Sequence, residues 1–242
     1  MNTVIVSAYY SIPSKKPHSE YKEYLKRWFR SIRCTVLFFT SADLLAELKA
    51  LVPLTSTNIQ WQTLERSDWN AWSLGRTFWE RQKARDPESY HTTELAAVWF
   101  EKKEFVARAA LLTDAEVLVW CDAGCVRDDA TEAAMRSFGL RNAPFLHDGT
   151  LHFQQLQQIP QKPFYTFPDA RIAGAVLGGN RSAWARYIQL YDTVLREYDE
   201  AGVCANMDQY VMARVCDRFP EACTLHEPDN SLDPWFFFVG ML

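Results

Sequence analysis

Apolar residues follow two different spacings in the first quarter of the chain. Residues 3–8 and 34–39 are short apolar runs, and residues 58–64 alternate between apolar and polar side chains, so all three predict β-strands. Between them, apolar positions three and four residues apart predict amphipathic helices over 19–32 and from 41 to the proline at 53. The order strand, helix, strand, helix, strand is typical of one half of a doubly wound α/β sheet.

A fourth strand is predicted at residues 117–120, where the apolar run is unbroken, as in a strand covered on both faces of a parallel sheet. The run stops at Asp122, which places a carboxylate at the carboxyl end of the strand. Gly124 and Arg127 follow within a few residues. Ligands of open α/β sheets bind at this edge, so we expect the acid, the glycine and the base to meet there.

Before this strand, residues 65–89 predict a broken helix, and Thr92 or Thr93 is expected to cap a long helix that reaches Ala109. Lys102 lies on the apolar stripe of that helix, so its side chain must either extend to solvent along its stem or meet an anion. Its neighbour Lys103 points about 100° away and is expected to be solvated.

The second half of the chain continues with alternating strand and helix signals. The predicted elements are a helix over 128–138, a strand pair over 144–153 turning at Asp148-Gly149, a loop over 154–168, a strand over 171–177 that ends at Gly178-Gly179, helices over 182–198 and from 206 to 219, a strand over 222–225 that ends at His226, and a last apolar strand or exposed patch at 235–239. The glycine pair is expected at the ligand edge of the sheet, where it would allow a ligand to approach closely.

Composition narrows the class of protein. The 242 residues show no linker or repeat, so we expect one domain, and 48% hydrophobic residues suffice for a large core. The net charge of −4 argues against a nucleic-acid partner. Six cysteines without metal-ligand spacing indicate buried thiols in a reducing compartment, and neither a signal peptide nor a membrane-spanning run is recognisable. A cytoplasmic location is therefore expected.

Several segments together resemble the HtrL/YibB-type family of glycosyltransferases, enzymes that look like members of the GT-A fold. The matching segments are Val4 to Tyr10, Glu94-Leu95 with Trp99 to Val106, Trp120-Cys-Asp-Ala-Gly-Cys-Val-Arg127, Ala173-Gly-Ala175 with Gly178-Gly179, and Asp208-Gln209. They span most of the chain, and the run from Trp120 to Arg127 is the most specific.

The resemblance implies a GT-A-like, Rossmann-type α/β domain over 1–242, with a mixed, mostly parallel central sheet and helices on both faces. Residues 1–125 would bind a nucleotide-diphosphate sugar such as a UDP-sugar, and residues 126–242 would bind the acceptor. The implied activity is transfer of a hexosyl or deoxyhexosyl group to a hydroxyl of a glycan or glycolipid, as in polysaccharide biosynthesis.

The resemblance also implies roles for individual residues. In GT-A enzymes an Asp-x-Asp motif binds Mn²⁺ or Mg²⁺ on the donor diphosphate, but here Gly124 replaces the second acid. Asp122 would hold the metal, with Asp128 and His226 completing the site; alternatively, Lys102 and Arg127 would neutralise the diphosphate without metal. Asp208 would serve the acceptor as general base or hydrogen-bond acceptor. The remaining donor-binding candidates are Ala8, Tyr9, Tyr10, Ala123, Gly178 and Gly179.

Three other hypotheses remain open. A scaffold protein that binds a nucleotide sugar without catalysis would explain Gly124 in place of the second acid. Another Rossmann-like transferase, such as a methyltransferase, is disfavoured because no glycine-rich turn follows the first strand. The third concerns location: an exposed patch of Phe236, Phe237 and Phe238 would allow peripheral contact with a membrane that carries a lipid-linked acceptor.

Overall fold

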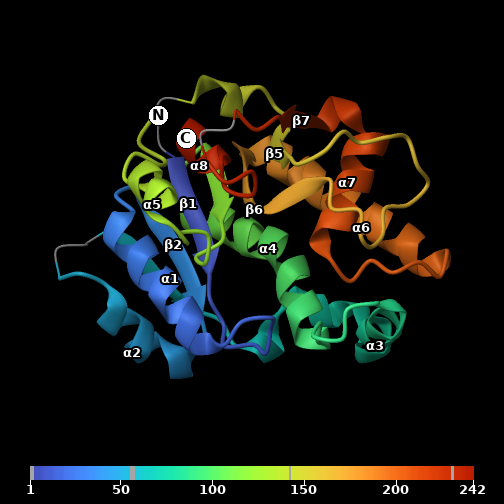
Figure 1. The fold of residues 1–242 in the computed structure, drawn as a ribbon, viewed down its shortest axis with the longest axis horizontal. Helices are drawn as coiled ribbons and strands as arrows, with labels where there is room; N and C mark the ends of the chain where they lie inside the picture. Colours follow the sequence, from blue (N-terminus) through green and yellow to red (C-terminus); the bar gives the residue numbers. More distant parts are fainter. Residues whose placement is uncertain (1–2, 55–57, 142, 230–231) are drawn as a thin grey trace.

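The computed structural model describes residues 3–54, 58–141, 143–229 and 232–242. Its centre is a seven-stranded sheet with the strand order β3-β2-β1-β4-β6-β5-β7 (Figure 1). The strands are β1 (Thr3–Ala8), β2 (Val36–Thr40), β3 (Ile59–Thr63), β4 (Val117–Cys121), β5 (Leu151–Gln155), β6 (Ile172–Asn180) and β7 (Cys223–His226).

One strand of the sheet is antiparallel to the others. β3, β2, β1 and β4 pair in parallel, and β5 pairs in parallel with β7, whereas β6 is antiparallel to both of its neighbours, β4 and β5. The mixed, mostly parallel sheet predicted from the sequence is therefore confirmed. Because of the reversal, the start of β6 lies beside the end of β4, with Val176 opposite Cys121.

Helices cover both faces of the sheet, as predicted. The helices are α1 (His18–Ser31), α2 (Ala42–Leu51), α3 (Arg76–Arg85), α4 (Thr93–Leu112), α5 (Asp129–Met135), α6 (Arg181–Glu200), α7 (Asp208–Arg218) and α8 (Phe238–Met241), and the short 3₁₀ segments are η1 (Arg66–Asp68), η2 (Asn70–Leu74), η3 (Pro144–His147) and η4 (Pro220–Ala222). Side chains of α1, α5 and α8 share one core cluster with Ile5 and Val119, and those of α3, α4, α6 and α7 share the other with Val4 and Leu118.

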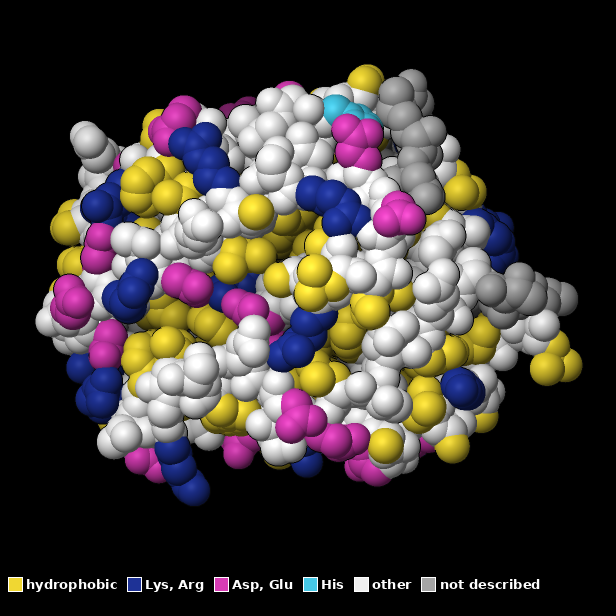
Figure 2. Space-filling model, turned by 180° about the vertical axis from the view of Figure 1, so that it is seen from behind, with side chains coloured by type: hydrophobic (Ala, Val, Ile, Leu, Met, Phe, Trp, Pro, Cys, Tyr) yellow, Lys and Arg dark blue, Asp and Glu magenta, His cyan; other side chains and the backbone are white. Residues whose placement is uncertain are grey.

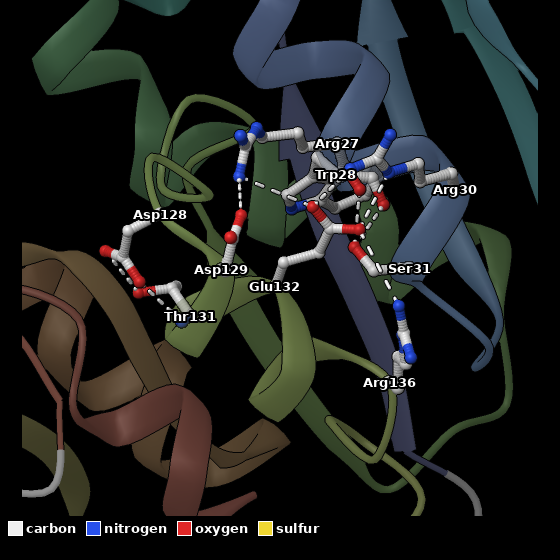
Figure 3. Close-up of polar contacts among 9 residues, drawn as sticks. All are labelled: Arg27, Trp28, Arg30, Ser31, Asp128, Asp129, Thr131, Glu132 and Arg136. Carbon is white, nitrogen blue, oxygen red and sulfur yellow. Dashed lines mark hydrogen bonds and ion pairs between the residues drawn. The ribbon is translucent and has the colours of Figure 1, made fainter.

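Hydrogen bonds to a buried glutamate connect the segment after β4 to α1. Glu132 of α5 receives two hydrogen bonds from the guanidinium of Arg30 and is also near Arg27 (Figure 3). The hydrogen bonds from Arg30 lower the pKa of Glu132 despite its burial. Asp128 caps the same helix, since its Oδ1 accepts a hydrogen bond from the backbone N–H of Thr131 at 2.7 Å. These contacts fix the loop that carries Gly124 and Arg127.

Local predictions are wrong at three places, one of which is residues 235–239, where the structure has a turn and the start of the short helix α8 and no strand. Residues 144–153 do not form a strand pair: Pro144–His147 is a 3₁₀ helix, consistent with a proline that has no N–H for a strand ladder, and only Leu151–Gln155 is a strand. Lys103 is not solvated. It is 3% exposed and its Nζ lies 2.9 Å from Asp192, because α6 packs over this part of α4.

The face opposite α1 and α5 is hollowed. Figure 2 shows hydrophobic side chains in the hollows and acidic and basic side chains beside them. One cavity of about 400 Å³ lies between η2, α4 and α6, with Phe100 and Leu195 among its apolar residues and Glu104 and Asp192 among its acids.

Two sequence-based expectations concern the cysteines and the membrane. All six cysteines are free thiols, and Cys121 and Cys125 lie with their sulfur atoms 3.6 Å apart at the end of β4. Within the described residues, we find no helix with the length and apolar character required to cross a membrane.

Candidate functional site

Asp122 stands at the carboxyl end of β4, as predicted, and its carboxylate is held by two donors. The indole N–H of Trp120 donates to Oδ1 at 2.7 Å, and Nζ of Lys102 lies 3.2 Å from Oδ1 and 3.3 Å from Oδ2. The backbone N–H of Asp122 donates to the carbonyl of Ala175 on β6 at 2.8 Å. The side chain keeps 36% of its surface exposed, so it remains accessible from the crevice.

Lys102 is buried between two carboxylates. Its Nζ lies 3.0 Å from Oδ2 of Asp208, in addition to Asp122, and donates to the carbonyl of Gly174 at 2.8 Å. Burial acts to lower the pKa of Lys102, but the two carboxylates outweigh it and the pKa is raised. The side chain is therefore a fixed ammonium at the sheet edge. Of the two alternatives drawn from the sequence, contact with anions is the one observed.

Asp208 begins α7 and is 4% exposed. Its Oδ1 accepts a hydrogen bond from the backbone N–H of Gln209 at 2.9 Å, and its Oδ2 lies 3.0 Å from the Lys102 ammonium. Burial raises the pKa of Asp208, and Lys102 only partly opposes the rise. A carboxylate in this state is a stronger base than an exposed aspartate.

Gly174 makes room for this carboxylate. A Cβ atom at position 174 would lie 2.9 Å from Oδ2 of Asp208, closer than such atoms approach. The residue belongs to β6, near the start of the strand and next to the end of β4. The Ala-Gly-Ala motif of the sequence therefore contributes to the site through its glycine.

Two pockets adjoin at these charges. The first has a volume of about 290 Å³ and the second about 310 Å³, and five residues line both: Trp99, Lys102, Asp122, Arg127 and Phe236. The first pocket is further lined by Ala8, Tyr9, Tyr10, Ile12, Ser14, Tyr21, Leu95, Val98, Trp120, Ala123, Gly124 and Cys125, and the second by Gly174, Ala175, Met207, Asp208, Gln209, Asp233 and Trp235. Six of the 17 residues that line the first pocket are aromatic, and the second pocket adds the carboxylates of Asp208 and Asp233 to that of Asp122.

The two tyrosines among the donor-binding candidates differ in their surroundings. Tyr10 is 6% exposed; its hydroxyl donates to the carbonyl of Leu64 at 2.9 Å and its ring packs on Trp69, so it is mostly a core residue. Tyr9 is half-buried, with its hydroxyl hydrogen-bonded to His18 and its ring tilted against Tyr21. Tyr9 and Tyr21 thus form the aromatic wall of the first pocket.

Arg127 provides the second cation at the junction of the pockets. Its Nε donates to the carbonyl of Gly124 at 3.1 Å, and its guanidinium lies 5.0 Å from the ring centre of Phe236 and 5.6 Å from that of Tyr24. The side chain is exposed, so the guanidinium is held between aromatic rings and still faces solvent.

Gly178 and Gly179 do not lie at the carboxyl end of β4, so the prediction that they lie at the ligand-binding edge of the sheet is wrong. They pair with Val119 and Leu118 near the start of β4, because β6 runs antiparallel to it. Close packing explains the glycines: a Cβ at 178 would meet Leu146, and one at 179 would meet the carbonyl of Thr150 at 3.0 Å.

His226 does not approach Asp122 either. It lies on the edge strand β7, with β6 and β5 between it and β4, a separation of roughly 14 Å at the usual strand spacing. Its Nε2 shares a hydrogen bond of 2.9 Å with Nδ1 of His152, whose Nε2 lies 3.2 Å from Asp148. Burial, with His152 as the next cause, lowers the pKa of His226 to about 4.

The predicted metal ligands therefore do not gather around Asp122. Asp128 is used as a helix cap, His226 pairs with His152, and both oxygens of Asp122 face nitrogen donors. In the part of the chain that the structure describes, no three His, Cys, Asp or Glu side chains are grouped as metal ligands would be. The ammonium of Lys102 stands between Asp122 and Asp208, where a shared cation would lie, so these residues do not fit a divalent metal.

Sequence reasoning missed several lining residues. Trp99 was part of a recognised motif but carried no assigned role, and Tyr21 looked like one apolar position of a helix stripe. Phe236, Trp235 and Asp233 come from the end of the chain, and nothing in a linear pattern shows that this segment returns to the edge of β4.

The chain resembles known proteins in its structure, whereas comparison of its sequence finds no match. No family model matches the chain, and no curated protein matches it. The structure is similar to that of apo mouse xyloside xylosyltransferase 1, with a TM-score of 0.53 and 11% identity over 93% of this chain and 84% of that one. A glycosyltransferase involved in glycosylation of the major capsid of PBCV-1 aligns with a TM-score of 0.45 and 13% identity over 94% and 83%. The likeness to the mouse enzyme is one of fold, and the predicted GT-A-like class is confirmed.

Proposed function

We propose that this protein is a glycosyltransferase that moves a sugar from a nucleotide-diphosphate-sugar donor to a hydroxyl of a glycan or glycolipid. The observation that carries the proposal is the pair of adjoining pockets that share Lys102, Asp122 and Arg127. A group-transfer enzyme needs two substrates to meet at one charged junction. The GT-A-like fold supports this function, and we also propose membership of the HtrL/YibB-type family on the motifs described above.

The first pocket is suited to the donor. Tyr9 and Tyr21 offer ring surface to a base, and the loop of Ala123 and Gly124 brings backbone close to the pocket. Lys102 and Arg127 lie where the pockets meet, so a diphosphate that extends from the base toward the second pocket reaches both cations. Cations in this place stabilise the negative charge that develops on the leaving diphosphate.

The second pocket is suited to the acceptor. In the proposed reaction an acceptor hydroxyl oxygen forms a bond to the anomeric carbon of the donor sugar, the bond from that carbon to the diphosphate breaks, and Asp208 takes the hydroxyl proton. Asp208 lines this pocket, its Oδ2 lies 3.0 Å from the Lys102 ammonium, and the raised pKa of the carboxyl favours the role of base. Asp122 positions the ammonium of Lys102 and presents its exposed part to the donor.

The proposed mechanism uses Lys102 and Arg127 for the diphosphate, because the described residues do not fit a divalent metal. The test is a thermal-shift panel of nucleotide sugars and nucleoside diphosphates, with and without Mn²⁺. A rise in Tm with one diphosphate and no Mn²⁺ supports this assignment. A rise in Tm that requires Mn²⁺ contradicts the metal-free binding of the diphosphate but still supports the proposed transferase function.

A non-catalytic scaffold is the second candidate, favoured by the mutual pairing of Asp122 and Lys102 and by Gly124 in place of a second acid. Asp122→Asn separates the two functions. A scaffold should keep its nucleotide binding and lose stability at most, whereas the transferase should lose turnover while remaining folded. Sugar release from a bound donor, followed by chromatography, provides the readout.

A further inference from the structure

Trp235 differs from its aromatic neighbours at the end of the described chain. Phe236, Phe237 and Phe238 are 5% exposed or less, so they do not form the exposed patch on which membrane contact was predicted. Trp235 is 41% exposed and lies in the lining of the second pocket. A large indole surface is therefore open to solvent beside the proposed acceptor site.

The position of Trp235 is fixed by a buried amide. The Nε2 of Gln154, which is fully buried on β5, donates to the carbonyl of Trp235 at 3.0 Å, and its Oε1 accepts the N–H of Phe238 at 2.8 Å. Asp233 accepts the backbone N–H of Trp235 at 2.9 Å. The indole is thus presented by anchored backbone.

Acidic oxygens face the same pocket. Asp122, Asp208 and Asp233 line it, and the carboxylate of Asp208 lies between the Lys102 ammonium, at 3.0 Å, and the backbone N–H of Gln209. Carboxylates accept hydrogen bonds from hydroxyl groups and repel phosphates and other carboxylates. Lys102 and Arg127 also line this pocket, at its junction with the first, so its acids outnumber its bases by three to two, whereas the first pocket has the same two bases and Asp122 as its one acid.

An indole face next to carboxylates matches the two surfaces of a pyranose. One side of the ring exposes C–H groups that pack on an aromatic face, and the edge carries hydroxyls that donate hydrogen bonds. We propose that the second pocket binds an uncharged sugar, stacked on Trp235, with one sugar hydroxyl donating a hydrogen bond to the carboxylate of Asp208. This inference rests on the proposed function and narrows its acceptor to neutral sugars, to the exclusion of sugar phosphates and uronic acids.

The test measures acceptor binding without turnover. Protein saturated with the nucleoside diphosphate that raises its Tm is mixed with methyl glycosides of glucose, galactose, xylose and N-acetylglucosamine, and with methyl glucuronide and glucose 6-phosphate. Saturation-transfer NMR and titration of the indole fluorescence report binding. We expect at least one neutral glycoside to bind and the two anionic probes to bind at least about tenfold more weakly.

Variants connect the signal to Trp235. Trp235→Ala should weaken binding of the neutral glycoside about tenfold and leave the nucleotide-induced Tm shift unchanged. Gln154→Leu should weaken it as well, because the backbone of Trp235 loses its anchor. Phe167→Ala, at an aromatic that is also exposed but outside both pockets, should leave glycoside and nucleotide binding unchanged.

The opposite outcomes are distinguishable. Equal or tighter binding of glucose 6-phosphate or methyl glucuronide overturns the inference, as does full glycoside affinity in Trp235→Ala. Absence of glycoside binding in protein that still binds a nucleoside diphosphate overturns the acceptor assignment and leaves the donor site standing. If neither class binds to folded protein, the proposed function fails together with the inference.

Discussion

The ammonium of Lys102 and the carboxylate of Asp208 lie 3.0 Å apart, although they belong to different helices, α4 and α7. Both side chains are buried, and Asp122 completes the group from the end of β4. A charged cluster of this kind joins α4, α7 and the end of β4 at the place where the pockets meet. Its removal should therefore affect both stability and chemistry.

Lys102→Met should destabilise the fold by about 3–5 kcal/mol, the usual cost of leaving a buried charge without its partner. Urea unfolding measures the difference. The control is Lys22→Met, since the ion pair of Lys22 with Glu47 is partly exposed and its loss should change little. The double variant Lys102→Met with Asp208→Asn should recover part of the loss; additive losses would contradict a direct pairing.

Asp208→Asn should reduce kcat by roughly 10²–10⁴, the contribution of a general base, because the amide cannot take the hydroxyl proton. The nucleotide-induced Tm shift should persist, since the residue lines the second pocket and not the first. Turnover within threefold of the parent enzyme would exclude Asp208 as the base.

Gly174→Ala should destabilise the protein by about 1–3 kcal/mol, because the new methyl group would meet Oδ2 of Asp208. Gly124→Ala is the matched comparison: its methyl group would meet the ring of Tyr21 at 3.4 Å, an ordinary contact, and stability should fall much less. In an Asp208→Ala background the cost of Gly174→Ala should largely disappear. An unchanged cost there would point to the backbone of β6 as the cause.

His226 should make the fold sensitive to acid. Its pKa in the folded protein is about 4, below the ordinary value, so the folded state disfavours the protonated imidazole. The contribution of His226 to stability is then complete above about pH 6.5 and falls as the pH drops from there toward 4, by about 1–2 kcal/mol, because solvent screens the partly exposed imidazole. Urea unfolding between pH 8 and 4.5 should show a smaller loss for His226→Gln. Parallel curves would mean that His152 and Asp148 carry the effect.

Apolar patterning predicted much of the sheet edge because it reports burial. The unbroken apolar run of β4 ends at Asp122, which placed this carboxylate at the edge of the sheet. The apolar stripe of α4 predicted that Lys102 lies on the side of the helix that packs against the core. Both predictions depend on one element and its nearest packing layer. Residues whose role follows from a single strand or helix were therefore found.

The same patterning does not report strand direction. An apolar run reads alike in either direction, so β6 was expected to bring Gly178 and Gly179 to the site, whereas the reversed strand brings Gly174. His226 was misplaced for a related reason, since spacing along the chain says nothing of strand order. Trp235 depends on the amide of Gln154, a contact between residues 81 positions apart.

The contribution of Phe236 to both pockets has a consequence for synthesis of the chain. The seven strands are all translated by residue 226, so the sheet has its complete sequence while the pockets still lack a wall. Domains begin to fold as they leave the ribosome. We therefore expect a nascent chain that has emerged only as far as β7 to pair its strands while the proposed donor and acceptor pockets still lack Phe236.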